Sequence, residues 1–440
     1  MQPAARLQAV IEILEDVETG IAQAGVPADV AVANYTRTRR YIGSKDRRAI
    51  TELVYTIIRQ RGRHAWRLAQ AGMQLDGRNL VISHAGLNDQ QLLDHFGSNV
   101  AHAPAATTDP EKNALSAMPS GLKGAPLFAS HEVPEHLWTP LKQRFGEQFN
   151  IAVQALNEQA PIDIRSNPLK RNNKLIHLLN EVDETIENNE FSPIAFRLKK
   201  RLNLSAHPLL RDGYIEVQDT AAQVASYLVE AQAGMSVIDL CAGAGGKSLL
   251  LSALMGNKGQ VFAFDTSGAR LKNAKPRIDR AGCRNIQLKH LPSKELARSN
   301  LLSGFKAKAD RVVIDAPCSG TGTWRRNPDQ RWRLSEESIT GFVETQSTLL
   351  QEGAGLVKQG GRLVYMTCSV LPQENEAVAE AFLKGAGQEW SLIDYSEIWR
   401  RVLPSKPAET ASSNPRCLQL VPHLHQTDGF FVAIFERGLS

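Results

Sequence analysis

The stretch Val237–Ser248, VIDLCAGAGGKS, sets the architecture of this chain because it joins a strand to a helix through glycines. The run VIDL predicts a short buried strand. In the glycine loop (Cys241–Lys247), Gly243, Gly245 and Gly246 let the backbone approach a ligand closely, and the next helix presents its N-terminus there. The sequence therefore predicts a ligand site at the end of this strand.

Strand and helix signals alternate from about Tyr214 onward. After the glycine loop come QVFAFD, IQLK, RVVID and GRLVYMT, separated by helix-like segments. This alternation predicts an α/β fold with a doubly wound, mainly parallel sheet. The last apolar run, GFFVAIFE, is aromatic and β-branched, and it predicts an antiparallel strand at the edge of that sheet.

Asp265 closes the strand QVFAFD, where a carboxylate can accept hydrogen bonds from ribose hydroxyls. Together with the glycine loop it indicates a cofactor that contains a nucleoside. Neither the dinucleotide pattern GxGxxG nor the phosphate-loop pattern GxxxxGK[ST] is present, which disfavours NAD and ATP.

Two cysteines lie at the ends of predicted strands, Cys318 in DAPCSGTG and Cys368 in VYMTCSV. Ligands of open α/β sheets bind beyond the carboxyl ends of the strands, so both thiols are expected to face one pocket. The alternative for either thiol alone is an ordinary buried cysteine, because free cysteine is among the most buried residue types.

Composition places the chain among globular proteins. Its 440 residues allow two or three domains, and 42% hydrophobic with 22% charged residues is ordinary. The N-terminus lacks the apolar core of a signal peptide, and no run approaches the roughly 20 apolar residues of a membrane span, so a cytoplasmic protein is expected. The five cysteines are scattered and form no C-x-x-C pair, so neither a disulfide framework nor a metal site is expected.

The N-terminal region predicts a helical bundle through about residue 90. One apolar stripe with helical spacing starts at Leu7, and a second starts at Ile50. Ten basic residues accompany only two acidic ones between positions 37 and 67: Arg37, Arg39, Arg40, Lys45, Arg47, Arg48, Arg59, Arg61, Arg63 and Arg67. This excess suits a polyanion such as nucleic acid, and the alternative is a solvated helical face.

A segment rich in Ala, Pro, Ser and Thr follows, without periodicity, and predicts a linker or variable loop. The next segment predicts a small α+β module with clustered basic residues that favour a second contact with nucleic acid. These residues are Arg165, Lys170, Arg171, Lys174, Lys199, Lys200 and Arg201.

The ordered strings DLCAGAGGK, FAFD, DAPCSGTG and MTCSVLPQENE resemble the Fmu/Sun family of RNA cytosine-5 methyltransferases, in particular the bacterial 16S rRNA methyltransferase B branch. The resemblance runs from about Asp163 to Glu436, and the N-terminal bundle resembles the NusB-like domain of part of this family. It implies a seven-stranded Rossmann-like methyltransferase domain over 213–440, an RNA-binding helical domain over 1–95, a linker over 96–133 and an RNA-binding module over 134–212.

The resemblance also implies a mechanism. C5 of cytosine is a poor nucleophile until a thiolate adds to C6 and forms an enamine. By family resemblance Cys368 attacks C6 and Cys318 assists release, while Asp315 contacts the cytosine edge. The residues implied to hold S-adenosylmethionine are Cys241, Ala242, Gly243, Ala244, Gly245, Gly246, Lys247, Asp265 and Asp315. Ala244 departs from the family, which usually has proline there.

RNA is the expected partner, with ribosomal RNA as the first choice of substrate and tRNA as an alternative. The enzyme is expected to be a monomer. A DNA methyltransferase is disfavoured because no long target-recognition insertion follows the catalytic core. A non-catalytic RNA-binding assembly or antitermination factor is a further alternative. Trp324, Arg325, Arg326, Arg331 and Trp332 follow Cys318 and are expected either at the pocket mouth, against RNA, or packed inside the protein.

Overall fold

The computed structural model describes residues 1–23, 25–170, 179, 186–199, 204 and 207–439. The chain divides into two compact units. A helical unit comprises Met1–Lys142, Glu147–Glu158 and Thr323–Ser335. A sheet unit comprises Gln143–Gly146, Gln159–Gly322 and Glu336–Ser440. Each unit therefore combines segments that are far apart in the sequence.

The helical unit is built from helices that are joined by short connections. They are α1 (Pro3–Ala22), α2 (Ala28–Thr38), α3 (Ser44–Arg59), α4 (Arg61–Gln70), α5 (Gly77–Asn88), α6 (Asp109–Ala117), α7 (Leu127–His131), most of α8 (Glu135–Phe145), α9 (Phe149–Asn157) and α16 (Gln330–Arg333), with the 3₁₀ turns η1 (Gln90–His95) and η2 (Gly146–Gln148). Among the described residues of the whole chain, no helix combines the length and apolarity needed to cross a membrane.

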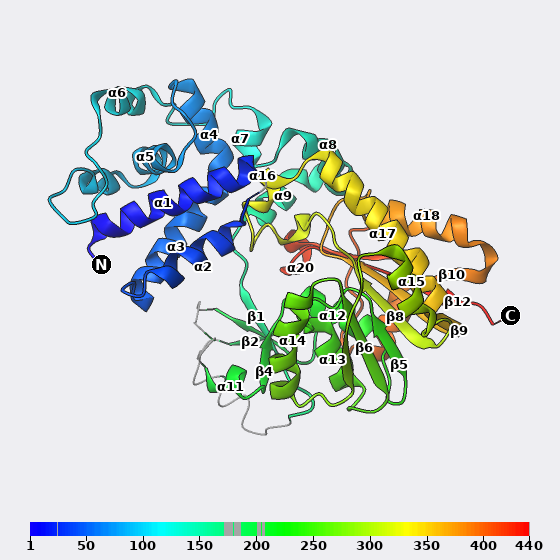
Figure 1. Ribbon diagram of the computed structural model, residues 1–440. Coiled ribbons are helices and arrows are strands. Elements are labelled where there is room, and N and C mark those ends of the chain that lie inside the picture. The colour runs from blue at the N-terminus through cyan, green and yellow to red at the C-terminus, as the bar shows by residue number, and fades with distance from the viewer. Residues whose placement is uncertain (24, 171–178, 180–185, 200–203, 205–206, 440) are drawn as a thin grey trace. The chain divides into compact units, whose positions relative to one another are not determined.

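The core of the helical unit follows the two predicted stripes. Leu7 and Leu14 of α1 and Val54 of α3 are at most 2% exposed and belong to one apolar cluster. Helix α5 adds Leu80 to the same cluster, and α1, α3 and α5 lie together in Figure 1. The predicted helical bundle is therefore present, and helical spacing of apolar residues explains which faces meet.

The segment expected as a linker, 96–133, contains two helices. Helix α6 begins with a capping box, in which the Thr108 hydroxyl accepts from the Glu111 N–H and the Glu111 carboxylate accepts from the Thr108 N–H. Such a cap satisfies backbone donors that would otherwise lack partners, so a short polar helix can form without an apolar stripe. The absence of periodicity concealed this helix.

The sheet unit begins with a small antiparallel sheet in the order β2-β3-β1-β4. Its strands are β1 (Ile162–Ser166), β2 (Glu187–Asn188), β3 (Ala195–Leu198) and β4 (Ile215–Val217). The short helix α11 (Pro208–Arg211) lies between β3 and β4 in the chain and packs Leu209 into the apolar cluster of this sheet. Ile164, Phe196 and Ile215 pack in its apolar cluster. Several residues of the predicted basic module, Arg171, Lys174, Lys200 and Arg201, lie outside the described residues.

The large sheet has the order β10-β12-β9-β8-β5-β6-β7, and β11 pairs with β12 beside this path. Its strands are β5 (Ser236–Asp239), β6 (Gln260–Asp265), β7 (Ile286–His290), β8 (Ala309–Asp315), β9 (Val357–Thr367), β10 (Trp390–Ile393), β11 (Leu418–Leu420) and β12 (Phe430–Arg437). The five strands from β9 to β7 are parallel, which confirms the doubly wound, Rossmann-like prediction.

The predicted edge position of GFFVAIFE is wrong. This run forms β12, which is antiparallel to β9 as expected but lies inside the sheet, because β10 pairs with its other side. Strand β10 runs only from Trp390 to Ile393, and a run this short gives a weak strand signal in the sequence. A run buried on both sides needs apolar residues throughout, which explains why β12 lacks polar alternation.

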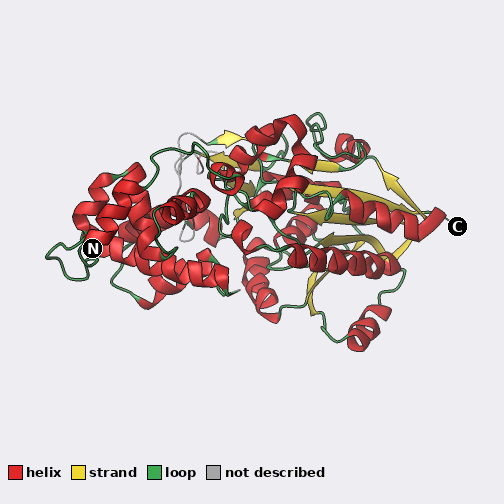
Figure 2. Ribbon diagram, turned by 90° about the horizontal axis from the view of Figure 1, so that it is seen from above, coloured by secondary structure: helices red, strands yellow, loops and turns green. Residues whose placement is uncertain are grey.

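Helices cover both faces of the large sheet (Figure 2). They are α12 (Thr220–Leu228), α13 (Gly246–Leu254), α14 (Gly268–Ala281), α15 (Glu295–Ser303), α17 (Glu336–Leu356), α18 (Glu376–Ala386) and α19 (Tyr395–Val402), with the short turns α20 (Pro422–His425), η4 (Thr321–Thr323) and η5 (Gly387–Glu389). Neighbouring residues of one strand enter different clusters: Val313 of β8 packs with α12 and α19, whereas Val312 and Ile314 pack with α17. This alternation is the two-residue period of a strand.

The segment Thr323–Ser335 follows the Cys318 loop in sequence but belongs to the helical unit. Trp324 is fully buried, and the Arg331 guanidinium lies 4.7 Å from the centre of its ring. Arg331 Nη1 also donates to the Glu132 carbonyl, and Asp329 accepts from the Ala28 N–H at the start of α2. Of the two placements expected from the sequence, internal packing is therefore the one found for Trp324 and Arg331.

Replacing Trp324 by alanine is expected to destabilise the helical unit by about 3–5 kcal/mol, because a large, fully buried side chain leaves a cavity. Thermal and urea unfolding of Trp324→Ala and wild type measure the effect. Tyr41→Ala, at a side chain that is 68% exposed, is the matched control and should change stability by at most about 0.5 kcal/mol. Equal, small effects of both substitutions would contradict the buried position of Trp324.

Candidate active site

The glycine loop connects β5 to α13 at the carboxyl edge of the sheet. Gly243 and Gly245 have φ angles of +56° and +82°, values that favour glycine, and α13 begins directly at Gly246. A Cβ on Gly243 would meet no atom within 4 Å, so this side of the loop is open. The loop thus presents backbone and a helix N-terminus to open space, as the sequence predicted.

Two arginines support the glycine loop from behind. Arg277 of α14 donates to the Ala244 carbonyl at 2.8 Å, and Arg165 of β1 donates to the Gly246 carbonyl at 3.3 Å. Arg165 is 2% exposed, and burial lowers its pKa to about 10. The expectation that Arg165 contacts nucleic acid is therefore wrong. The sequence around Arg165 does not indicate this supporting role, because Gly246, whose carbonyl Arg165 binds, lies 81 positions away.

Asp265 ends β6 next to the glycine loop and is 5% exposed. Its carboxylate oxygens accept from the Gly243 N–H at 2.8 Å and from the Ser267 N–H at 2.7 Å. Each oxygen of an ionised carboxylate has a second lone pair, so the group can still accept from hydroxyls. Asp265 therefore fixes the loop and remains suited to a ribose.

Lys247 and Asp315 form an ion pair at the carboxyl edge. Lys247 Nζ lies 2.5 Å from Asp315 Oδ2 and 4.9 Å from the centre of the Phe430 ring. The side chain of Lys247 is 11% exposed and that of Asp315 is 32% exposed. Lys247 was expected to hold the cofactor, but its ammonium binds Asp315, the residue that was expected to contact the cytosine edge. At the start of the glycine loop, burial raises the pKa of the Cys241 thiol well above its usual value.

The structure brings the two cysteines together. Cys318 follows β8, Cys368 follows β9, and their Sγ atoms are 3.4 Å apart. Both residues are partly exposed. The hydrogen bond with Cys368, followed by loss of hydration around the sulfur, raises the pKa of the Cys318 thiol well above its usual value. Either sulfur can be the donor of this hydrogen bond, and the raised pKa disfavours the thiolate form of Cys318.

Several residues around the thiols were not expected from the sequence. Gly322 donates its N–H to the Cys368 carbonyl at 2.9 Å, and its own carbonyl accepts from Gly429 at 2.8 Å. A Cβ on Gly322 would collide with the Gly429 backbone, so this close approach requires glycine. Glu374 contacts the serines that follow both cysteines. Gly322 lies in DAPCSGTG, Glu374 in MTCSVLPQENE and Gly429 at the start of GFFVAIFE, but nothing in a single sequence pairs these residues with the thiols.

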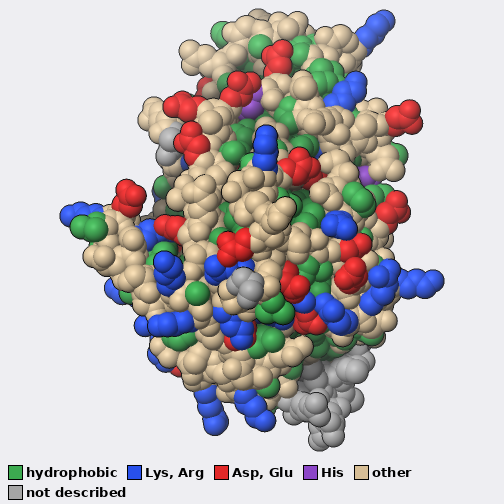
Figure 3. All heavy atoms as spheres, turned by 90° about the vertical axis from the view of Figure 1, so that its right-hand side faces the viewer, with side chains coloured by type: hydrophobic (Ala, Val, Ile, Leu, Met, Phe, Trp, Pro, Cys, Tyr) green, Lys and Arg blue, Asp and Glu red, His purple; other side chains and the backbone are tan. Residues whose placement is uncertain are grey.

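Part of the basic cluster at positions 37–67 stabilises the helical unit itself. Arg61 makes a bidentate ion pair with Glu18, and Arg67 is 3% exposed and donates to Ser83 and Pro119 carbonyls. Arg59 donates to the Asn157 and Arg325 carbonyls. The exposed members are Arg37, Arg40, Lys45, Arg47 and Arg48. On the face of the sheet unit that Figure 3 presents, basic and acidic side chains are intermixed.

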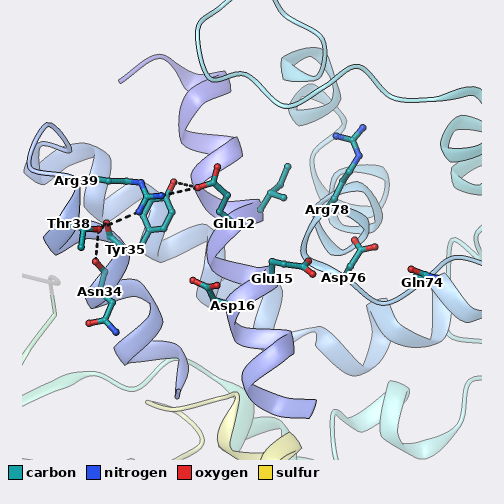
Figure 4. A pocket seen from close by; sticks show the side chains of 11 residues that line it. Glu12, Glu15, Asp16, Asn34, Tyr35, Thr38, Arg39, Gln74, Asp76 and Arg78 are labelled. Carbon is teal, nitrogen blue, oxygen red and sulfur yellow. Dashed lines mark hydrogen bonds and ion pairs between the residues drawn. The ribbon is translucent and has the colours of Figure 1, made fainter. Parts of the chain in front are cut away.

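A hollow of about 740 Å³ lies in the helical unit between α1, α2 and the start of α5 (Figure 4). Its polar groups largely satisfy one another. Glu12 accepts from Tyr35 at 2.8 Å and from Arg39 at 3.4 Å, while Glu15 accepts from the Gly77 N–H at 2.7 Å. None of the residues expected to carry chemistry lines this hollow.

The fold and the site together define a class of protein. A doubly wound sheet with an open glycine loop after one parallel strand and an acid at the end of the next is the arrangement of nucleoside-cofactor enzymes. The sequence profile described as 16S rRNA methyltransferase RsmB/F matches residues 226–436. That range contains the glycine loop, Asp265, Asp315 and both cysteines.

Curated relatives point the same way. A probable ribosomal RNA small subunit methyltransferase B of Synechocystis is 29% identical, with 97% of this chain and 98% of the relative covered. The ribosomal RNA small subunit methyltransferase B of Photorhabdus laumondii is 30% identical over 69% of this chain and 66% of its own length. The probable Bacillus subtilis enzyme is 31% identical over 57% of this chain and 54% of its own length.

Solved structures support the same assignment. The crystal structure of PH0851 has a TM-score of 0.77 at 25% identity and covers 99% of both chains. A methyltransferase homologue from Pyrococcus horikoshii has a TM-score of 0.58 at 27% identity, with 71% of this chain and 97% of that chain covered. The chain belongs to the RsmB/F family of methyltransferases, and it is an RNA methyltransferase.

S-adenosylmethionine is the cofactor of this family, and the residues present fit it. The open side of Gly243 leaves room beside the glycine loop, and the Asp265 carboxylate keeps acceptor capacity for ribose hydroxyls. Replacement of the usual proline by Ala244 leaves the loop intact, because the Ala244 carbonyl is held by Arg277. Among the described residues, no group of His, Cys, Asp and Glu side chains is arranged to hold a metal ion.

Asp239, at the end of β5, predicts a pH dependence of stability. Burial raises its pKa to about 6, above the roughly 3.9 of an unfolded chain, although Ser248 donates to it at 2.6 Å. The folded protein therefore binds a proton that the unfolded chain has lost between about pH 4 and 6. Stability contributed by the protonated group is present at low pH and is lost as pH rises through about 6.

Asp239→Asn should accordingly unfold at higher temperature than wild type at pH 7, by up to about 3 kcal/mol in free energy. The gain should shrink at pH 4.5, where wild-type Asp239 is protonated. Thermal unfolding of both proteins at the two pH values measures it, with Asp94→Asn as an exposed control. A gain that is the same at both pH values would refute the assignment to Asp239.

Proposed function

We propose that the protein methylates C5 of a cytosine in 16S rRNA through a covalent bond between Cys368 Sγ and C6 of the base. The observation that carries this proposal is the pair of thiols 3.4 Å apart, at the carboxyl edge of the sheet where Asp315 ends β8 and pairs with Lys247. Activation of C5 requires a nucleophile at C6, and a thiolate is suited to this addition.

Cys368 is the attacking thiol in this proposal. The resemblance to the family assigns the attack to the cysteine that follows β9, and the raised pKa of the Cys318 thiol disfavours Cys318 as the thiolate. When the Cys368 thiolate adds to C6, negative charge develops on the ring at N3 and O2. Asp315 lies at this edge with Lys247 beside it, and the pair supplies a polar contact to the cytosine edge and a positive charge near the ring.

Release reverses the addition. S-adenosylmethionine supplies the methyl group that becomes bonded to C5. The C5 proton then leaves to water, its bonding electrons form the C5–C6 double bond, and the C6–S electrons return to Cys368. The Cys318 S–H donates to the departing sulfur and stabilises its developing charge, which is the role expected of the second thiol.

The two cysteines should therefore behave differently when replaced. Cys368→Ala should lose methyl transfer by about three orders of magnitude or more, as removal of a catalytic nucleophile does, and should form no covalent RNA complex. Cys318→Ala should form the bond to C6 and release it slowly, so a protein–RNA complex should accumulate. Labelled S-adenosylmethionine and denaturing gels measure both effects on small-subunit rRNA.

Cys283→Ala is the matched control, since this thiol is 7% exposed in another apolar cluster and should retain activity. A complex that accumulates in Cys368→Ala would instead assign the attack to Cys318. Absence of methyl transfer from every folded variant and from wild type would favour an RNA-binding role without catalysis.

The substrate is proposed to be small-subunit rRNA because the family profile and the relatives are named for it. Deletion of the gene should remove one C5-methylated cytosine from 16S rRNA, and bisulfite sequencing of total RNA from deletion and parent strains measures this. Restoration by wild type but not by Cys368→Ala is the control. Loss of methylation from tRNA alone would contradict the rRNA assignment.

A further inference from the structure

Glu216 is a buried carboxylate of the small antiparallel sheet that binds two arginines of α14. It lies on β4 and is 3% exposed. Its Oε2 accepts from Arg277 Nη2 at 2.9 Å, and its Oε1 accepts from Arg280 Nη2 at 2.7 Å and from Arg280 Nε at 3.1 Å. A buried carboxylate is tolerated when it is paired and hydrogen-bonded, so Glu216 and the two guanidinium groups fix one another in place.

The two arginines differ in one contact. Both lie on α14, and their side chains are 24% and 28% exposed. Arg277 also donates from Nη1 to the Ala244 carbonyl of the glycine loop at 2.8 Å. Within the described part of the chain, no hydrogen bond joins the side chain of Arg280 to that loop. Arg277 therefore connects Glu216 to the glycine loop, whereas Arg280 binds the same carboxylate without this connection.

The Ala244 carbonyl lies in a part of the loop that has wide backbone freedom. Ala244 stands between Gly243 and Gly245, which both have positive φ angles. Because glycine adopts many backbone conformations, the peptide groups around Ala244 keep one orientation only if their polar atoms are held. The Gly243 N–H donates to Asp265 at 2.8 Å, and Arg277 binds the Ala244 carbonyl. Loss of the bond from Arg277 would therefore loosen the loop between its two glycines.

Arg165 is the other arginine that holds the loop, and it faces the same carboxylate. It lies directly opposite Glu216 in the antiparallel pairing of β1 with β4, so the two side chains are on the same face of the sheet. Arg165 donates to the Gly246 carbonyl at 3.3 Å. Burial lowers the pKa of Arg165 to about 10, and the negative charge of Glu216 opposes this effect. One carboxylate thus stabilises both arginines that bind carbonyls of the glycine loop.

We propose that Glu216 is a positioning residue for the cofactor: by fixing Arg277 and by stabilising the charge of Arg165, it holds the glycine loop in the conformation that binds S-adenosylmethionine. A loop that is already ordered loses less conformational freedom when its ligand binds, so affinity depends on this support. The small antiparallel sheet therefore takes part in cofactor binding. The proposal goes beyond the proposed function, because it holds whichever base or RNA is methylated.

Binding of S-adenosylhomocysteine, which lacks the methyl group that is transferred, tests the proposal without RNA. Isothermal titration calorimetry of the whole chain measures its Kd. Arg277→Ala should raise the Kd by about tenfold, as loss of a hydrogen bond from a charged donor does. Glu216→Gln keeps the volume of the side chain but removes its charge, and it should raise the Kd by a similar factor.

Arg280→Ala is the matched control. It removes an ion pair with the same carboxylate and a side chain of similar exposure, but no contact with the glycine loop. Its Kd should stay within about twofold of wild type, although thermal unfolding should show both arginine variants destabilised to a similar extent. Glu187→Gln removes an exposed charge from β2 of the same small sheet and should leave the Kd unchanged.

Steady-state methyl transfer to small-subunit rRNA gives a second readout. If Arg277 only positions the cofactor loop, Arg277→Ala should raise the KM for S-adenosylmethionine by about the same factor as the Kd. Its kcat should stay within about twofold of wild type, because the lost interaction contributes equally to the ground state and the transition state. A general loss of structure would instead lower the amount of active protein and leave the KM unchanged.

Equal Kd values for Arg277→Ala and Arg280→Ala overturn the proposal, and so does an unchanged Kd in folded Glu216→Gln. If Glu216→Gln does not fold, the two arginine variants still decide. Failure of the proposed function has a different signature: S-adenosylhomocysteine would bind with the expected order of affinities, but wild type would transfer no methyl group to cytosine in small-subunit rRNA.

Discussion

The parallel pairing of β8 with β9 is the interaction on which the site depends. Asp315 lies opposite Met366 in this pairing, so the two strands end side by side and the loops that follow them place Cys318 and Cys368 close together. Their Sγ atoms then meet at 3.4 Å. A shift of the register by one residue would turn every side chain to the other face and separate the thiols.

Around this pairing, the sheet unit uses buried polar groups to hold irregular backbone. The glycine loop is held by Asp265, Arg277 and Arg165, and the cysteine loops are held by Glu374 with its serines. Loops at the end of a sheet cannot satisfy their backbone groups within regular structure, so side chains must do it. The site is therefore rigid at the positions where substrate and cofactor have to be aligned.

The features that depend on neighbouring residues were predictable from the sequence. The strand, glycine loop and helix are contiguous, and the two cysteines end apolar runs that any parallel sheet would align. The contacts that depend on distant residues were not. Ser319 and Glu374 are 55 positions apart, β12 is placed by its pairing with β10, and Trp324 packs in the helical unit although it follows a cysteine loop. Such pairings are decided by tertiary packing, which a single sequence does not display.

The most direct test of the account is the identity of the sulfur that bonds to the base. Small-subunit rRNA containing 5-fluorocytidine traps the adduct, because fluorine at C5 cannot leave as a proton does. Wild-type protein incubated with this RNA and S-adenosylmethionine, digested and analysed by mass spectrometry, should yield a nucleotide-linked peptide that contains Cys368. A nucleotide linked to the peptide that contains Cys318, or no linked peptide at all, would contradict the account.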